Sequence, residues 1–385
     1  MEKKNPEFDD IRPYYDEEVT AVIERLLSDP EFRRVIMGYV FPDRDWDEFQ
    51  TLMRSFKTKR EFQHSLVKHT VLGLVSKSAA SVTCSGLENI EKDQAYTFLS
   101  NHRDIVLDAS LISSTLGING YDTTEIAIGD NLLVQPWIED LVRLNKSFIV
   151  KRGVSVRQIL EVARHLSEYI HFAIEEKKES VWIAQREGRA KDSNDRTQES
   201  LLKMLAMGGD PDWFKSLQSL NITPISLSYE YDPCDYLKAK EFQQKRDNPE
   251  FKKSPHDDLL NMETGLFGDK GNIHFQFGEP INSSLQLLDN KLKKNELITA
   301  VASLIDTGIF RNYRFYPVNY IAYDRLWGGN LFLECYTAED LQNFDRYMQQ
   351  QLDKIDLPDK DLPFLTEMMW TMYAYPVKNH LEIAT

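Results

Sequence analysis

Short apolar segments alternate with helix-like segments from Ser81 to Phe277, and this pattern limits the chain to a small set of folds. A short apolar run bounded by polar or turn residues is typical of a buried strand. The candidate strands are residues 96–99, 126–128, 148–150, 181–184, 222–229 and 273–277. The clearest helical spacing between them is that of Val156, Ile159, Leu160, Ala163, Leu166 and Ile170, of which Val156 lies outside the residues that the structure describes. The alternation predicts an α/β fold: a mixed, largely parallel sheet flanked by helices, with functional residues at the strand ends.

The regions on either side of this pattern are predicted to be helical. Before residue 81, apolar residues repeat at helical spacing from Val19 to Leu27 and from Phe49 to Phe56, with no strand pattern. Residues 232–270 are polar and contain several prolines and glycines, which predicts an insertion or a loop. We therefore expect an N-terminal helical domain at 1–80, an α/β domain at 81–285 and a C-terminal helical extension at 286–385.

A histidine and two carboxylates stand together in the segment Phe98 to Asp108, which runs from an apolar strand into a polar turn. A histidine that takes a proton from an alcohol near neutral pH needs a carboxylate to orient it and to stabilise its charged form. Asp108 begins the next apolar run and would lie in the first turn of a helix, where the dipole favours an anion. Asp104 is the alternative partner of His102. In a non-catalytic alternative, these residues only form a turn and a helix cap.

The composition argues against several classes of protein. The 385 residues carry a formal net charge of −15, which argues against nucleic-acid binding. Cys84, Cys234 and Cys335 have neither paired nor metal-ligand spacing, so we expect no disulfide framework, no metal site and a reducing compartment. The sequence shows no signal-peptide pattern and no apolar run near the ~20 residues that span a bilayer. These features predict a cytoplasmic protein.

Basic residues gather in three places despite the acidic balance. The stretch from Arg143 to Leu160 contains Lys151, Arg152 and other basic residues but no acidic one, and a second group follows in 186–191. Because arginine binds a phosphate through two parallel hydrogen bonds, these two groups predict an anion site. The third is Lys57 to Ser78, which is either a basic interfacial helix on a membrane or a solvated helix of the N-terminal domain. We favour the solvated helix.

Five segments carry a resemblance to a known family. They are Phe98–Asp108, Ser147–Arg152, Val181–Lys191, Ile222–Leu227 and Phe277–Ile281. In order and spacing, over about residues 81–285, they resemble the sequence blocks of the glycerol-3-phosphate and lysophosphatidate acyltransferase superfamily. Two departures accompany the resemblance. Five residues, rather than the family's four, separate His102 from Asp108, and Arg189 directly follows Gly188, so that the third block is one residue short.

The resemblance implies roles for particular residues and a glycerolipid acyltransferase fold for residues 81–285. His102 would be the catalytic base, with Asp108 or Asp104 as its partner. The implied substrate-binding residues are Lys151, Arg152, Arg186, Glu187, Gly188, Arg189 and Pro224. No cofactor and no metal are expected. A G-x-S-x-G nucleophile motif does not occur, which argues against a serine hydrolase.

The implied reaction transfers a fatty acyl group from acyl-CoA or an acyl carrier protein to a hydroxyl of a glycerol phosphate, in phospholipid biosynthesis. We expect 1-acylglycerol-3-phosphate (lysophosphatidate) as the acceptor, with glycerol 3-phosphate as the alternative. A non-catalytic lipid- or acyl-carrier-binding protein on the same scaffold is a second hypothesis. A third is a peripheral membrane or partner-binding protein that works through its N-terminal helices and its aromatic C-terminus. For the enzyme we expect a cytoplasmic location, with peripheral contact at the inner face of the membrane.

Overall fold

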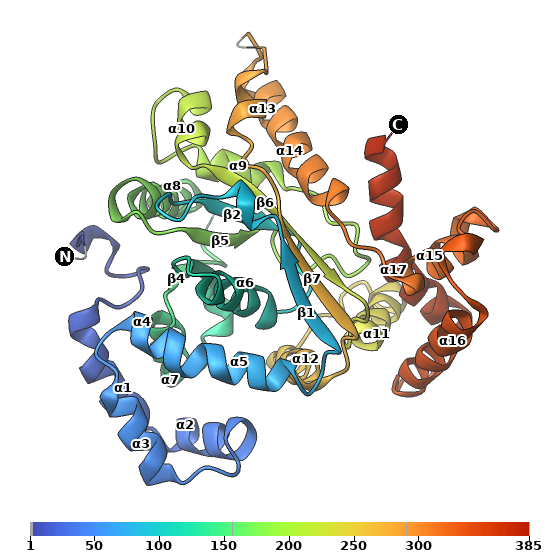
Figure 1. Ribbon diagram of the computed structural model, residues 1–385, viewed down its shortest axis with the longest axis horizontal. Coiled ribbons are helices and arrows are strands. Elements are labelled where there is room, and N and C mark those ends of the chain that lie inside the picture. Colours follow the sequence, from blue (N-terminus) through green and yellow to red (C-terminus); the bar gives the residue numbers. More distant parts are fainter. Residues whose placement is uncertain (1–2, 156, 290, 385) are drawn as a thin grey trace.

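A seven-stranded sheet forms the centre of the computed structural model, which describes residues 3–155, 157–289 and 291–384. The strand order across the sheet is β1-β7-β6-β2-β5-β3-β4 (Figure 1). The strands are β1 (Ser81–Ser85), β2 (Thr97–Ser100), β3 (Glu125–Gly129), β4 (Ser147–Val150), β5 (Val181–Ala184), β6 (Ile222–Tyr229) and β7 (Asn272–Phe277). Six of them lie where apolar runs predicted them. The prediction missed β1, because its Ser-Val-Thr-Cys-Ser sequence contains no apolar run.

Strand direction determines where side chains from different loops can meet. β2 runs parallel to both β5 and β6, and β3 runs parallel to both β4 and β5. β1 and β7 are parallel to each other, but β7 is antiparallel to β6. The predicted mixed, largely parallel sheet is confirmed. Since β2 to β6 all point the same way, their carboxyl ends share one edge of the sheet, where sites form in such folds.

Helices cover both faces of the sheet and bury two apolar cores (Figure 1). One core lies under α8 (Ile159–His171), α9 (Glu199–Leu205), α10 (Trp213–Ser219), α13 (Asn282–Gln286) and α14 (Lys294–Arg311). The other lies under α5 (Lys68–Val75) and α6 (Leu107–Ile118). Phe98 and Phe275 are at most 1% exposed in the second core, and each such side chain stabilises the fold by about 1.5 to 3 kcal/mol. The predicted helix–sheet layers therefore hold the strand ends rigidly.

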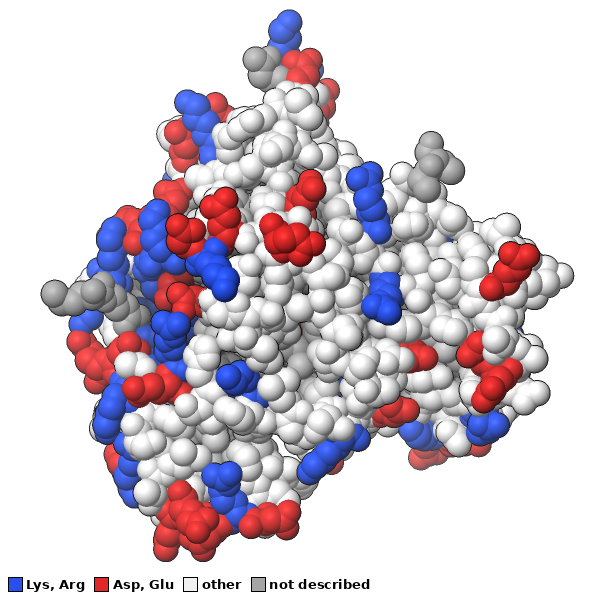
Figure 2. Space-filling view, in the orientation of Figure 1, with Lys and Arg blue, Asp and Glu red and all other residues white. Residues whose placement is uncertain are grey.

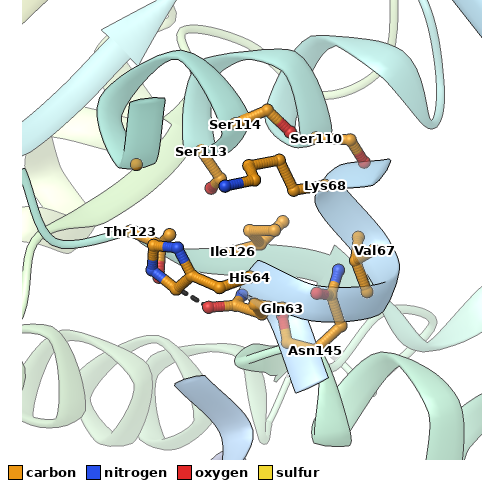
Figure 3. Close-up of a pocket in the computed structure, with 11 residues that line it drawn as sticks. Gln63, His64, Val67, Lys68, Ser110, Ser113, Ser114, Thr123, Ile126 and Asn145 are labelled. Atoms are coloured by element: carbon orange, nitrogen blue, oxygen red, sulfur yellow. Dashed lines mark hydrogen bonds between the residues drawn. The ribbon is translucent and has the colours of Figure 1, made fainter. Parts of the chain in front are cut away.

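A small polar pocket lies between α5 and α6, away from the strand ends (Figure 3). Lys68 and His64 enter it from the α5 side, and Ser110, Ser113 and Ser114 line it from one face of α6. Burial and the nearby Lys68 lower the pKa of His64. The serines let the two helices approach closely, so the pocket is explained by helix packing.

The N-terminal helices have an apolar core of their own, which Leu144 completes. Within it, Phe62 and Leu66 are buried, so the apolar side of the basic stretch 57–78 contacts protein. Lys59 in the same stretch is buried and forms an ion pair with Asp16. This packing agrees with the favoured reading of that stretch as part of the N-terminal domain. The helices are α1 (Val19–Ser28), α2 (Pro30–Val35), α3 (Trp46–Ser55), α4 (Lys59–Phe62) and α7 (Pro136–Leu144).

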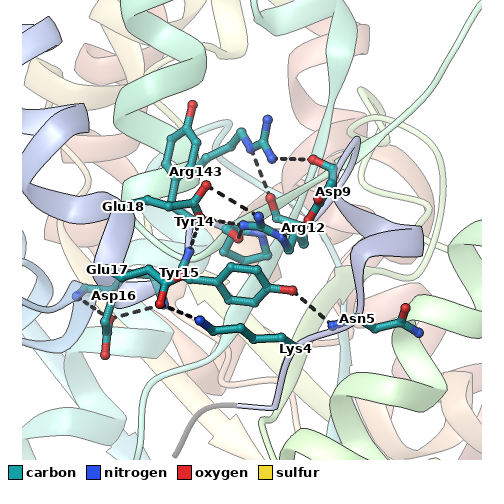
Figure 4. Close-up of polar contacts among 12 residues, drawn as sticks. Lys4, Asn5, Asp9, Arg12, Tyr14, Tyr15, Asp16, Glu17, Glu18 and Arg143 are labelled. Carbon is teal, nitrogen blue, oxygen red and sulfur yellow. Dashed lines mark hydrogen bonds and ion pairs between the residues drawn. The ribbon is translucent and has the colours of Figure 1, made fainter.

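Residues 3–18 form an arm that runs along the edge strand β4. The backbone N–H of Ile149 donates to the carbonyl of Ile11 at 2.8 Å. The arm thus provides an acceptor for one backbone group on the edge of the sheet that no other strand covers. Arg12 stacks on the Tyr15 ring, 3.5 Å from its centre, and donates to Glu18 at 2.7 Å (Figure 4). Arg143 donates to the carbonyl of Arg12 at 2.9 Å. One residue of the predicted anion-binding stretch is thus a structural anchor.

Lys146, from the same basic stretch, is also structural. Its ammonium is buried and donates to the carbonyl of Thr123 at 2.9 Å and to Glu179 at 2.6 Å. On the face shown in Figure 2, Lys/Arg and Asp/Glu side chains lie interspersed along the left side, over the N-terminal helices. The net negative charge therefore does not form one acidic surface there.

The prediction of a loop at residues 232–270 is wrong in part, because the segment contains α11 (Asp235–Asp247) and α12 (Pro255–Phe267). Ser254 and Asp257 form a capping box that starts α12. Asp235 is fully buried and accepts hydrogen bonds from Tyr347, at 2.9 Å, and Tyr373, at 2.7 Å. Burial and the charge of Asp232 raise the pKa of Asp235 to about 7. These contacts bind α11 to the C-terminal helices.

The C-terminal region adds α15 (Pro317–Tyr323), α16 (Ala338–Asp353) and α17 (Leu362–Ala384), which share a third core with α11. Met369, Met372 and Tyr373 of the aromatic C-terminus are buried in this core. α14, by contrast, packs against β6 in the main core, although it follows residue 285. Among the described residues, no helix has the length and apolar character needed to cross a bilayer.

Candidate active site

The loops that follow the parallel strands meet at the carboxyl edge of the sheet. The turn after β2 carries His102, and the loop after β5 carries Arg186 and Arg189. β6 ends at Tyr229, beside the turn. Asn101 joins the turn to β6, because its side chain accepts from the Leu227 N–H at 2.8 Å and donates to the Leu227 carbonyl at 2.9 Å. The fold therefore fixes the start of the turn.

His102 and Asp108 form a hydrogen-bonded pair, with 2.8 Å between His102 Nδ1 and Asp108 Oδ2. The backbone N–H groups of Arg103 and Asp104 donate to the same oxygen at 2.7 and 3.0 Å, and Tyr229 donates to Oδ1 at 2.9 Å. Asp108 is 0% exposed and lies in the first turn of α6. A buried carboxylate is costly unless it is hydrogen-bonded, and here donors surround it at a helix N-terminus. The pair is held in one geometry.

Asp104, the alternative partner, does not contact His102. Its Oδ1 accepts from the backbone N–H groups of Val106 and Leu107 at 2.8 and 2.7 Å, as a helix-capping side chain does. Burial, together with the charge of Asp108, raises the pKa of Asp104. Gly265 of α12 lies directly against it, since a Cβ at residue 265 would be 2.0 Å from Asp104 Oδ2. The structure thus pairs His102 with Asp108, and the turn accommodates the longer spacing.

The His102 ring packs against Trp182 of β5. The two rings meet edge to face with 5.7 Å between their centres. The Trp182 indole donates to Ser100 Oγ at 3.0 Å, which fixes the tryptophan in turn. The His102 side chain remains 14% exposed. With Nδ1 engaged by Asp108, Nε2 is the nitrogen that can take a proton from a substrate.

The loop after β5 brings two arginines to the same edge. Arg189 Nη2 donates to Asn261 of α12 at 3.1 Å. Arg189 Nη1 and Arg186 Nε are buried and have no hydrogen-bond partner among the described residues. Gly188 between them has φ of +65°, a conformation that favours glycine. Buried donors of this kind are typical of a site whose ligand or ordered water supplies the acceptor.

Three predicted substrate-binding residues lie at the rim of this site or outside it. Arg152 is half exposed and pairs with the exposed Glu187 at 3.2 Å. Lys151 instead forms an ion pair with Asp10 of the N-terminal arm, so its ammonium is already engaged.

Pro224 is not among the polar residues of the site, and the structure does not support its prediction as a substrate-binding residue. It lies inside β6, in register with Leu99 of β2. Its ring packs against Gly308 of α14, where a Cβ at residue 308 would be 2.7 Å from Pro224 Cγ. A proline within the sheet acts on packing and removes one backbone donor.

Three residues that the sequence did not single out complete the surroundings of the pair. Tyr229 holds Asp108, as described above. Arg103 is 8% exposed and Asp195 is 0% exposed, with 3.3 Å between Arg103 Nη1 and Asp195 Oδ2. Neither atom has a hydrogen bond among the described residues. Burial raises the pKa of Asp195, and Arg103 opposes that rise. The position of Arg103 next to His102 was the one sequence signal available for this group.

The chain matches the family model described as Acyltransferase over residues 81–219. This range holds β1 to β5, the His102–Asp108 pair and both arginines of the loop after β5. Residues 81–219 thus carry an acyltransferase domain. The predicted enzyme class and the resemblance to acyltransferases are confirmed.

One of the solved structures to which the chain is similar is a remote relative. It is the crystal structure of the 1-acyl-sn-glycerophosphate (LPA) acyltransferase PlsC from Thermotoga maritima, with 14% sequence identity and a TM-score of 0.37. The match covers 75% of this chain and 94% of that chain. No curated protein matches the chain.

Proposed function

We propose that the protein transfers a fatty acyl group from a thioester, acyl-CoA or acyl carrier protein, to a hydroxyl of a glycerol phosphate. The acceptor we favour is 1-acylglycerol-3-phosphate, which would place the reaction in phospholipid biosynthesis. The observation that carries the proposal is the oriented His102–Asp108 pair inside an acyltransferase domain. The buried, unpartnered donors of Arg186 and Arg189 at the same edge support an anionic acceptor.

In the proposed mechanism, His102 is the general base. Nε2 takes the proton of the acceptor hydroxyl while Nδ1–H donates to Asp108, whose negative charge stabilises the imidazolium. The acceptor oxygen forms a bond to the thioester carbonyl carbon, and the carbon–sulfur bond then breaks. The leaving thiolate receives the proton from His102, so the enzyme returns to its starting state. No acyl-enzyme is needed, because the pair acts directly on the acceptor.

The acceptor phosphate would lie on the loop after β5. Arg186 and Arg189 provide charged donors there, and Arg152 adds a third guanidinium at the rim. Lys151 is predicted to contribute less, since its ammonium pairs with Asp10. Glu187 keeps Arg152 at the rim, and Gly188 gives the loop its turn. His102 would then stand between the phosphate and the thioester.

A non-catalytic binding protein on the same scaffold is the second candidate. The solvation of Asp108 by Tyr229 and two backbone N–H groups weighs against it, because a binding protein needs no buried charge behind a histidine. We predict a cytoplasmic location with contact at the inner face of the membrane, because a lipid acceptor would be found there.

The test incubates the purified chain with palmitoyl-CoA or palmitoyl-acyl carrier protein and with either lysophosphatidate or glycerol 3-phosphate. Thiol release and product mass are both measured. We expect thiol release that requires an acceptor, with phosphatidate as the main product. An intact His102→Ala variant that transfers acyl groups at the normal rate would contradict the mechanism. Acceptor-independent binding without product would favour the second candidate.

A further inference from the structure

A second cavity lies beside the candidate active site, between the end of β6 and the C-terminal helices. Its walls come from β6, from the segment 313–314 that links α14 to α15, and from α17. Tyr229 lines it with its ring while its hydroxyl donates to Asp108. His102, Arg186 and Arg189 are not among its lining residues. The cavity is therefore adjacent to the catalytic pair and distinct from the loop assigned above to the acceptor phosphate.

Three donor groups without acceptors converge on this cavity. Arg103 Nη1 and the Tyr313 hydroxyl are buried and have no hydrogen-bond partner among the described residues. Arg314 is exposed, and within the described chain its guanidinium has neither an ion pair nor a side-chain hydrogen bond. Its backbone N–H alone is bound, to Ser228 Oγ at 3.0 Å. Two arginines and a phenol thus line one space, and neither Arg103 Nη1 nor the Tyr313 hydroxyl makes a hydrogen bond within the described chain.

The acidic residues around the cavity are already compensated. Asp232, the one carboxylate among the described lining residues, forms an ion pair with the buried Lys238. Asp195 lies 3.3 Å from Arg103 Nη1 but forms no hydrogen bond with it. Arg103 faces these two carboxylates and also Asp108, so Arg314 is the cation at the cavity that no carboxylate pairs with in the described chain. An anion with several acceptor oxygens is the ligand that the unpartnered donors favour.

We propose that this cavity binds a phosphate group, with Arg103 and Tyr313 at its base and Arg314 at its mouth. A phosphate monoester supplies several acceptor oxygens, and guanidinium groups bind phosphate with charge-assisted hydrogen bonds. The cavity volume of about 30 Å³ corresponds to roughly two water positions. It therefore admits part of a phosphate group, whose other oxygens and any attached molecule would lie at the mouth beside the exposed Arg314.

The residues around the proposed phosphate site connect it to the His102–Asp108 pair. Leu227, Met372 and Pro376 form apolar walls, which exclude water and strengthen charged hydrogen bonds. Tyr229 lies between the cavity and Asp108. A phosphate held against Arg103 would also act on the turn whose backbone binds Asp108. This second site needs no acyl transfer to be present, so its test is separate from that of the proposed function.

The test measures the binding of inorganic phosphate to the full chain by titration calorimetry and by phosphorus NMR. Arg314→Ala should weaken one class of site roughly tenfold or more, because a charged donor is lost. Tyr313→Phe removes a neutral donor and should weaken the same class about threefold. Arg311→Ala is the matched control, since Arg311 is an exposed arginine three positions away that lies outside the cavity. It should leave binding unchanged.

Arg186→Ala separates this site from the acceptor loop, and binding at the cavity should persist in that variant. Competition then identifies the source of the phosphate: coenzyme A for the donor, glycerol 3-phosphate for the acceptor, and neither for free phosphate. Melting curves verify that each variant folds. The proposal is overturned if Arg314→Ala and Tyr313→Phe bind inorganic phosphate as tightly as Arg311→Ala, or if the unmodified chain binds none.

Discussion

Two loops at the carboxyl edge of the sheet differ in how their polar groups are satisfied. In the turn after β2, the capping oxygen of Asp104 and both oxygens of Asp108 accept short hydrogen bonds from within the chain. In the loop after β5, buried atoms of Gln185, Arg186 and Arg189 have no partner among the described residues. A group that must move a proton gains from being fixed beforehand, whereas a group that must bind a charged substrate has to keep donors available.

On the proposed function, this difference corresponds to chemistry in the first loop and substrate binding in the second. Substitutions in the turn after β2 should therefore lower turnover. Substitutions in the loop after β5 should instead raise the substrate concentration that half-saturates the enzyme.

The largest effect is expected from His102→Ala. Loss of a general base costs roughly a hundredfold or more in turnover, and His102 is partly exposed, so the variant should keep its fold. Acyl transfer and a thermal melt of the same sample measure both quantities. Near-normal turnover with a normal melt would remove the catalytic role from the turn.

The next effect distinguishes the two carboxylates. Asp108→Asn should lower turnover by roughly tenfold to a hundredfold, because the amide can no longer stabilise the imidazolium. Asp104→Asn should change turnover little, since asparagine also caps helices well. Asp104→Ala should reduce the free energy of unfolding by about 1 kcal/mol. The opposite ranking in activity would mean that the pair rearranges in solution.

Arg186→Ala and Arg189→Ala should act on binding. Each removes a charged donor, so we expect the acceptor half-saturation concentration to rise roughly tenfold, with a smaller change for the thioester. Arg152→Ala should have a weaker effect, because Arg152 is half exposed and paired with Glu187. Arg157→Ala, an exposed arginine of the same basic stretch, is the control. A selective loss of donor affinity instead would reverse the placement of the two substrates.

Tyr229→Phe should give the smallest effect. It removes one of the donors to Asp108 and leaves the ring in place, so turnover should fall about threefold to tenfold while half-saturation constants stay the same. A shift in the pH dependence of turnover would accompany it, because the carboxylate behind His102 becomes less stabilised. A change in acceptor affinity alone would place Tyr229 in the binding group.

The sequence predicted those parts of the molecule that depend on local pattern. Apolar runs predicted β2 to β7 because a buried strand needs such a run. β1 was missed because its residues are mostly small and polar and none of them is fully buried. α11 was missed because most of its residues are polar, and it is stabilised through Asp235 and distant tyrosines.

In the candidate site too, residues that are neighbours in the sequence could be predicted, whereas contacts between distant residues could not. His102 and its two candidate partners were visible because they are neighbours in the chain. The choice of Asp108 over Asp104 depends on backbone N–H directions, which spacing alone does not determine. The Arg103–Asp195 contact joins residues far apart in sequence and could not be predicted without the fold. The ion pair between Lys151 and Asp10 of the N-terminal arm could not be predicted either, because it joins residues far apart in the sequence.

That arm has a practical consequence for handling the protein. The Ile11–Ile149 hydrogen bond makes residues 3–18 a substitute for a further strand beside β4. A shortened chain without the arm would present unpaired backbone groups to other molecules, and such edges promote self-association. Affinity tags placed directly before the arm would crowd the same edge. Light scattering of tagged and trimmed samples would therefore be a useful check before any kinetic comparison.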